Sequence, residues 1–123
     1  MGEATDADGA SVERTFYRIV KNPAVTADDF QPAKRHGRPL RDPRLSRQWA
    51  EGVSVYDRLD YAMAQARRFR YRLGRFVVAL RVSALDGIEV EQSGDDPHHF
   101  TLYGNADLLC SIAQVPARRI DGA

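Results

Sequence analysis

Apolar residues recur with strand and helix periods over most of the chain, most clearly between Gly52 and Val82. Val53 and Val55 alternate with polar side chains, which predicts a strand. After Asp57, apolar residues fall at helical spacing and predict the main helix, with Gly74 just beyond its end. These positions are Leu59, Ala62, Met63, Ala66, Phe69 and Leu73. The dense apolar run at 76–82 predicts a second strand, buried on both faces.

Four further segments have the alternation or composition of strands. They lie at residues 15–20, 88–92 and 98–103, and from residue 110 to 115 or beyond. Asp86 and Gly87 form a turn signal, so we expect strands 76–82 and 88–92 to pair as a hairpin. Two short helices are expected, at 27–31 and between Pro43 and Gly52, with a brief helical turn at 106–109.

This order of elements predicts an α+β fold: a mixed, mainly antiparallel sheet of about six strands with one main helix and two short helices. Residues 1–13 have no apolar periodicity and are expected to form a disordered tail. Residues 14–120 are expected to form a single domain, because a chain of 123 residues fits one hydrophobic core.

Composition narrows the class of protein. Cys110 is the only cysteine, so the chain cannot form an internal disulfide, which fits a reducing compartment. No apolar run reaches membrane-spanning length, and the acidic start differs from a signal peptide. We therefore expect a cytoplasmic protein that does not bind membranes.

The charge is unevenly distributed although the net charge is only +1. Basic residues dominate between Lys34 and Arg81, whereas the segment at 86–107 is acidic. The main helix carries four arginines interleaved with two aromatic residues: Arg67, Arg68, Arg70 and Arg72, with Phe69 and Tyr71. One interpretation is a basic face that binds nucleic acid or an acidic protein. The other is an ordinary solvated helix face in an arginine-rich, GC-biased composition.

Three other features bear on chemistry. Arg18 alternates with apolar residues in the first strand, so it either faces solvent at a sheet edge or reaches into a cleft to hold an anion. The basic loop at 32–41 is either a substrate loop or a solvated connection. His98 and His99 are adjacent on a strand and point to opposite faces, so they do not readily share one metal ion, but His99 is suited to lining a cleft.

The arginine in Tyr17-Arg18-Ile19 and the Ser/Tyr strand Gly52-Val53-Ser54-Val55-Tyr56, which leads into a helix, form a sparse pattern. It resembles the ADP-ribosyltransferase-like fold, which includes RES-type toxins and RNA 2′-phosphotransferases, and it also looks like small uncharacterised bacterial proteins. The resemblance covers about residues 15–82.

The resemblance implies NAD as the cofactor and assigns roles to individual residues. Arg18 would bind the pyrophosphate or ribose of NAD, Ser54 would orient the nicotinamide ribose, and Tyr56 would stack on the nicotinamide ring. The family places a catalytic glutamate on a late strand; the candidates here are Glu89 and Glu91, of which Glu91 is preferred, although both lie early. His99 is expected to line the same cofactor pocket.

Two hypotheses follow. In the first, the chain is an NAD-using transferase or toxin-like enzyme whose small-molecule ligand is a nucleotide. In the second, it is a non-catalytic interaction module that binds an acidic protein or nucleic acid through its arginine-rich face.

Overall fold

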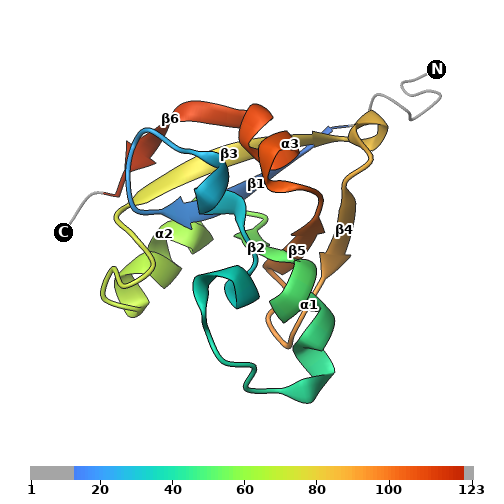
Figure 1. The fold of residues 1–123 in the computed structure, drawn as a ribbon. Coiled ribbons are helices and arrows are strands. Elements are labelled where there is room, and N and C mark those ends of the chain that lie inside the picture. The colour runs from blue at the N-terminus through green and yellow to red at the C-terminus, as the bar shows by residue number, and fades with distance from the viewer. Residues whose placement is uncertain (1–12, 121–123) are drawn as a thin grey trace.

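Strand-forming residues occupy six segments, and the fold joins them in one antiparallel sheet with helices on both faces (Figure 1). The computed structural model describes residues 13–120. In this part of the chain the strands are β1 (Glu13–Val20), β2 (Val53–Tyr56), β3 (Phe76–Ser83), β4 (Glu89–Gln92), β5 (His99–Tyr103) and β6 (Ala113–Arg119). The α-helices are α1 (Ser46–Glu51), α2 (Leu59–Arg68) and α3 (Ala106–Ser111), and 3-10 turns lie at η1 (Ala27–Phe30), η2 (Ala33–His36), η3 (Pro43–Leu45) and η4 (Ala84–Asp86).

The strand order is β4-β5-β2-β1-β3-β6, and all neighbouring pairs are antiparallel. The predicted α+β class with a six-stranded, mainly antiparallel sheet is therefore confirmed. β1 pairs with β3 along its whole length, from Glu13 opposite Ser83 to Val20 opposite Phe76. Its pairing with β2 consists of one position, Tyr17 opposite Tyr56. The sheet thus has two three-stranded halves that meet at a narrow contact between β1 and β2.

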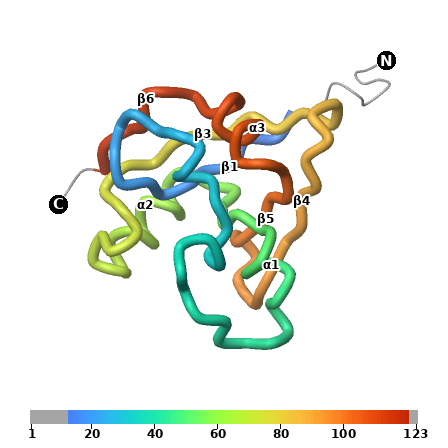
Figure 2. Tube along the Cα trace, viewed as in Figure 1, coloured from blue at the N-terminus to red at the C-terminus, as the bar shows by residue number. Residues whose placement is uncertain are grey.

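The alternation of β1 divides its side chains between two cores, as the sequence predicts. Phe16 and Val20 are buried on the face covered by Phe30 of η1 and Leu109 of α3. Ile19 is buried on the other face. There it packs with Ala62 and Ala66 of α2, Val77 of β3 and Ile120. The main helix therefore covers one face of the sheet, and η1 and α3 cover the other (Figure 2).

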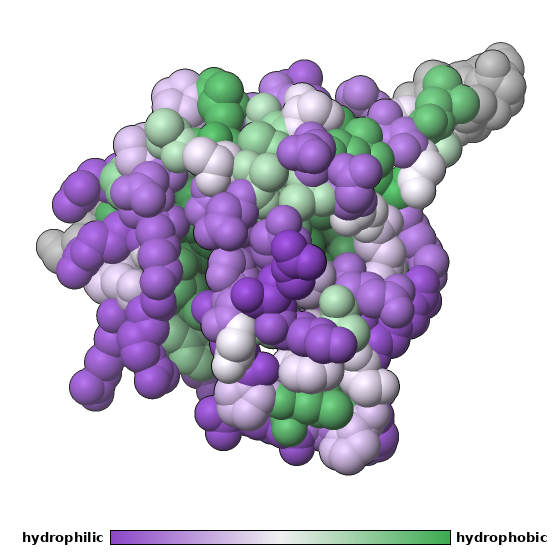
Figure 3. Space-filling model, viewed as in Figure 1, coloured by the Kyte–Doolittle hydropathy of each residue, from purple (hydrophilic) through white to green (hydrophobic). Residues whose placement is uncertain are grey.

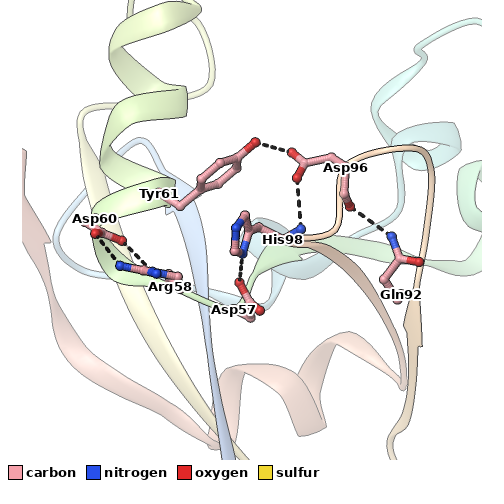
Figure 4. Close-up of polar contacts among 7 residues, drawn as sticks. All are labelled: Asp57, Arg58, Asp60, Tyr61, Gln92, Asp96 and His98. Atoms are coloured by element: carbon pink, nitrogen blue, oxygen red, sulfur yellow. Dashed lines mark hydrogen bonds and ion pairs between the residues drawn. The ribbon is translucent and has the colours of Figure 1, made fainter.

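A polar network holds the start of α2 against the turn between β4 and β5 (Figure 4). Tyr61 Oη donates to Asp96 Oδ2 at 2.5 Å, and Asp96 Oδ1 accepts from the backbone N–H of His98 at 2.9 Å. His98 Nδ1 lies 2.9 Å from Asp57 Oδ1. Burial opposes ionisation of Asp96, but the hydrogen bonds from Tyr61 and His98 outweigh it, so the pKa of Asp96 is lowered. Asp57 pairs with His98 in this network, and the N-cap position of α2 is occupied by Arg58.

The main helix is shorter than the sequence predicts. It ends at Arg68 instead of continuing to Leu73, because Arg70 and Tyr71 take positive φ angles of 54° and 60° and reverse the chain. The reversal brings Gly74 against the end of β1, with a φ of 141°. A Cβ atom built on Gly74 would lie 2.0 Å from the backbone oxygen of Val20, so only glycine fits there.

Two strand predictions are also wrong. β3 and β4 do not form the expected hairpin, because β3 already has β1 and β6 on its two edges and β4 pairs with β5. The last strand begins at Ala113 instead of Cys110, since residues 110 and 111 complete α3. It also runs beyond Pro116 to Arg119, and Ala117 within it is buried and donates its N–H to the Pro23 oxygen at 2.8 Å.

The strand boundaries differ from prediction by smaller amounts at the start of β1 and β5. Glu13, expected to belong to the tail, is the first residue of β1, and His98 precedes β5. The rest of the expected tail, residues 1–12, lies outside the described residues.

The close approach at Gly74 gives a stability prediction. Gly74→Ala should lower the free energy of unfolding by about 3–5 kcal/mol, because the clash is with backbone and the φ angle is unfavourable for a side chain. Gly94→Ala is the matched control: its φ is 75°, but nothing lies within 4 Å of the added methyl, so the loss should be about 1 kcal/mol. Urea denaturation followed by circular dichroism measures both, and equal losses would contradict close packing of Gly74 on β1.

Candidate functional site

A hollow of about 680 Å³ lies where β1 and β2 diverge beyond the Tyr17–Tyr56 pair. Its floor includes Arg18 of β1, Ser54 of β2 and His99 of β5. The basic loop at 32–41, expected from the sequence to be a substrate loop or a solvated connection, includes η2. It contributes Ala33, His36, Arg38, Pro39, Leu40 and Arg41 to the lining. The volume falls within the roughly 300–1,000 Å³ range of small-molecule sites.

Arg18 spans the opening between the two halves of the sheet. Its Nε donates to the backbone oxygen of Asp29 at 2.7 Å, and its Nη1 donates to the backbone oxygen of Ser54 at 2.7 Å. Of the two sequence interpretations, the edge position is wrong, because β1 lies between β2 and β3. Burial lowers the pKa of Arg18 to about 10; the charge of Asp29 opposes this shift and that of Arg38 adds to it. The guanidinium therefore remains charged at neutral pH without full hydration.

Ser54 and His99 form a directly hydrogen-bonded pair through Ser54 Oγ and His99 Nε2. The register explains their proximity, because Tyr56 lies opposite His99 and Ser54 opposite Thr101 on β5. His99 Nδ1 lies 3.1 Å from the backbone oxygen of Ser93. A carbonyl oxygen only accepts, so Nδ1 carries the proton and Nε2 is the acceptor.

This tautomer determines the direction of the hydrogen bond between Ser54 and His99. The hydroxyl proton of Ser54 points to His99, which leaves the lone pairs of Oγ for a donor on a ligand and increases the basicity of the oxygen. Ser93 supports the arrangement a second time: its Oγ lies 3.1 Å from His99 Nδ1 and 2.6 Å from Thr101 Oγ1. Ser54 itself is exposed, and it lines the hollow together with His99 and Thr101.

Gln48 presents an unsatisfied acceptor at this site. Its Nε2 donates to Glu91 Oε1 at 3.2 Å, whereas its Oε1 is buried and has no hydrogen-bond partner among the described residues. The same Glu91 oxygen accepts from Tyr103 Oη at 2.9 Å. Burial and this bond raise the pKa of Tyr103 to about 12. Gln48 is one of the residues that line the hollow, although its Oε1 atom is itself buried.

Trp49 places an aromatic ring at the same site. It is half-buried, and its Nε1 donates to the backbone oxygen of Arg38 at 2.7 Å. The Nζ atom of Lys34 lies 5.4 Å from the ring centroid. The hydrogen bond from Trp49 therefore connects α1 to the basic loop at 32–41 and holds the backbone of Arg38 beside the hollow.

The structure brings together three of the predicted site residues, namely Arg18, Ser54 and His99. Tyr56 and Glu91 do not line the hollow. The ring of Tyr56 lies 5.7 Å from the rings of both Tyr61 and His99, and Glu91 lies behind Gln48. Sequence reasoning missed Gln48 and Arg38 as individual residues. The density of basic residues around Arg38 was a sequence signal for an anion site, whereas no pattern in the sequence marks Gln48 as a site residue.

Two properties complete the description of residues 13–120. No group of three or more histidine, cysteine, aspartate or glutamate residues is placed to hold a metal ion. No helix in the same range has the length and apolar character needed to cross a membrane.

The tautomer assignment can be tested by NMR of the ring nitrogens. His99 should carry its proton on Nδ1 in the native protein, and also in Ser54→Ala, because the Ser93 carbonyl imposes it independently of Ser54. A proton on Nε2 in the native protein would show that Ser54 Oγ accepts from His99, and would reverse the polarity of the pair.

The bridging role of Arg18 predicts a loss of stability on neutral substitution. Arg18→Met removes the donors to Asp29 and Ser54 and should lower the free energy of unfolding by about 1–3 kcal/mol. Arg81→Met makes the same chemical change on the exposed side of β3 and should change it by no more than about 0.5 kcal/mol. Chemical denaturation measures the difference, and equal stabilities would mean that the two halves of the sheet hold together without the bridge.

Comparison of the chain with protein-family models, curated proteins and solved structures found no match. The resemblance to the ADP-ribosyltransferase-like fold therefore stays a prediction. The function of the protein has to be argued from the geometry of this site.

Proposed function

We propose that the hollow between β1 and β2 binds NAD and that the protein is an ADP-ribosyltransferase-like enzyme that cleaves the nicotinamide–ribose bond. The observation that carries the proposal is the presence of two guanidinium groups, Arg18 and Arg38, at one site. Their repulsion contributes to the lowered pKa of Arg18. A pyrophosphate between them would relieve this repulsion and form charge-assisted hydrogen bonds with both arginines.

The polar groups of the hollow fit the remainder of a dinucleotide. The buried Oε1 of Gln48 lacks a donor, and a ribose hydroxyl or the carboxamide of nicotinamide would supply one if the Gln48 side chain turned toward the hollow. The Oγ lone pairs of Ser54 suit a second ribose hydroxyl, since its proton is directed to His99. The ring of Trp49 offers a flat surface for a base. The ligand therefore meets cations, acceptors and an aromatic ring in one site.

In the proposed reaction the nicotinamide–ribose bond of NAD breaks and nicotinamide leaves with the bonding electrons. The oxygen of a water molecule or of an acceptor hydroxyl forms the new bond to the ribose carbon and releases its proton to solvent. Arg18 and Arg38 hold the phosphates, while the backbone bonds of Arg18 keep its guanidinium in place. Ser54 orients the ribose, and His99 fixes the hydroxyl of Ser54. Glu91 was expected as the carboxylate next to the ribose; held behind Gln48, it acts here as a positioning residue for that amide. Tyr56 is also a positioning residue, because its ring packs against that of His99.

Calorimetric titration with NAD, combined with chromatographic detection of released nicotinamide, tests the proposal. The native protein should bind NAD and release nicotinamide. Arg18→Lys keeps the charge but loses the fork that bonds two carbonyls, so it should weaken NAD binding about tenfold or more. Ser54→Ala should slow nicotinamide release by a similar factor, because one hydrogen bond to the ribose is lost.

Arg81→Lys is the matched control, because it is the same substitution at a residue outside the hollow. It should leave NAD binding and nicotinamide release unchanged. Thermal unfolding of each variant separates a loss of binding from a loss of folding. Absence of binding in the native protein would overturn the proposal, and binding with NAD left intact after long incubation would overturn the assignment as an enzyme.

A further inference from the structure

Six exposed arginines gather at the end of the sheet where β1 and β6 finish, and none of them lines the hollow. They are Arg68, Arg70, Arg72, Arg75, Arg118 and Arg119, and we call them the arginine patch. The sequence contains no aspartate or glutamate between Tyr61 and Leu85 or between Leu108 and Ile120. Within residues 13–120 the two chain segments that carry the patch therefore contain no acidic residue.

Sheet pairing brings the two halves of the patch together. Phe76 lies opposite Arg119 and Val77 opposite Arg118, and the backbone N–H of Ile120 donates to the oxygen of Arg75 at 2.9 Å. The segment after α2 and the end of β6 lie on the same side of the molecule in the Cα trace (Figure 2). Hydrophilic side chains project there in the space-filling view, at the left of the picture (Figure 3).

The backbone after α2 has an uncommon conformation that contributes to the patch. Arg70 and Tyr71 are consecutive residues in the left-handed region, which side chains other than glycine, asparagine and aspartate seldom occupy. The turn is closed by hydrogen bonds from Arg70 N to Arg67 O at 2.9 Å and from Tyr71 N to Ala66 O at 2.8 Å. Because the helix stops here, Arg70 and Arg72 extend from a turn instead of continuing along a helix face.

Three arginines of the patch lie over aromatic rings. The guanidinium carbons are 4.2 Å from the ring centroid of Tyr71 for Arg75, and 5.9 Å from Phe69 for Arg68 and from Phe76 for Arg119. Such contacts hold planar cations in place without neutralising them. Guanidinium planes and aromatic rings are also the groups on which nucleic acid bases stack.

Several acidic side chains of the described residues pair with arginines outside the patch. Exposed ion pairs join Arg44 to Asp42, Arg47 to Glu89 and Arg58 to Asp60. Within residues 13–120 none of the six patch arginines forms an ion pair with a carboxylate. The patch thus presents positive charge that the described part of the chain does not compensate.

We infer that the arginine patch is a docking surface for nucleic acid, which it contacts through the phosphate backbone. A protein partner would require an apolar anchor as well as charge. The exposed large apolar side chains of the described residues are Leu40, Leu45, Leu85 and Val115, and none belongs to the patch. A membrane surface would likewise require inserted apolar groups beside the cations. Arginines backed by aromatic rings, with no such anchor, fit a polyphosphate chain.

Fluorescence polarisation with a labelled single-stranded RNA of roughly 16 nucleotides tests the inference. If all six arginines contact phosphates, the logarithm of the affinity should fall against the logarithm of salt concentration with a slope of about −4, a loss of about 10²-fold between ~50 and ~200 mM. The triple variant Arg68→Gln, Arg70→Gln, Arg72→Gln should weaken binding and reduce this slope to about −2.

The control triple Arg35→Gln, Arg44→Gln, Arg81→Gln lowers the net charge equally but leaves the patch intact, so its salt slope should match that of the native protein. Equal losses in both triples would overturn the assignment to the patch. Competition by poly-glutamate or phosphatidylserine vesicles as effectively as by unlabelled RNA would overturn the assignment to nucleic acid. Because NAD is absent from this assay, its outcome is independent of the function proposed above.

Discussion

The fold depends on how its sheet is held together at the contact between β1 and β2. The ladder there consists of one pair, Tyr17 opposite Tyr56, whereas β1 and β3 pair over eight positions. Arg18 replaces the missing backbone contacts by donating to the carbonyl oxygens of Ser54 and Asp29. One side chain therefore joins the two halves of the sheet and leaves room for a hollow beside it.

This arrangement links the stability of the protein to the charge of its site. Arg18 is held in position by carbonyl oxygens and forms no carboxylate ion pair among the described residues, although the charge of Asp29 acts on it. Partial burial makes that charge less favourable, as its lowered pKa shows. The structure thus maintains an incompletely solvated cation at the wall of the hollow, and the proposed binding of a pyrophosphate relies on this charge. The exposed ion pair of Arg44 with Asp42 has no such consequence, since its charges cancel.

The sequence predicted those features that depend on local periodicity. Alternation placed Phe16 and Val20 opposite Ile19. The meeting of Arg18, Ser54 and His99 at one hollow was implied by the family resemblance and not by alternation. The predicted hairpin of β3 and β4 was wrong because both edges of β3 are taken by strands that are distant in the sequence, and local periodicity does not reveal such pairing. The predicted end of α2 was wrong because the apolar spacing continues through Phe69 and Leu73, whereas the backbone reverses at Arg70. The orphaned acceptor of Gln48 arises from tertiary burial, so no local pattern reveals it.

The hollow and the arginine patch meet at the end of β1, and this connection follows from one backbone contact. Gly74 packs against the Val20 oxygen and near the nitrogen of Lys21, and both Lys21 and Leu73 line the hollow. Arg72 and Arg75 of the patch flank the same glycine segment. A polyanion held on the patch would therefore lie beside the wall of the hollow, and its phosphates would add to the potential that Arg18 experiences. The close approach of Gly74 to β1 therefore fixes the backbone that carries Leu73 at the hollow and Arg72 and Arg75 in the patch.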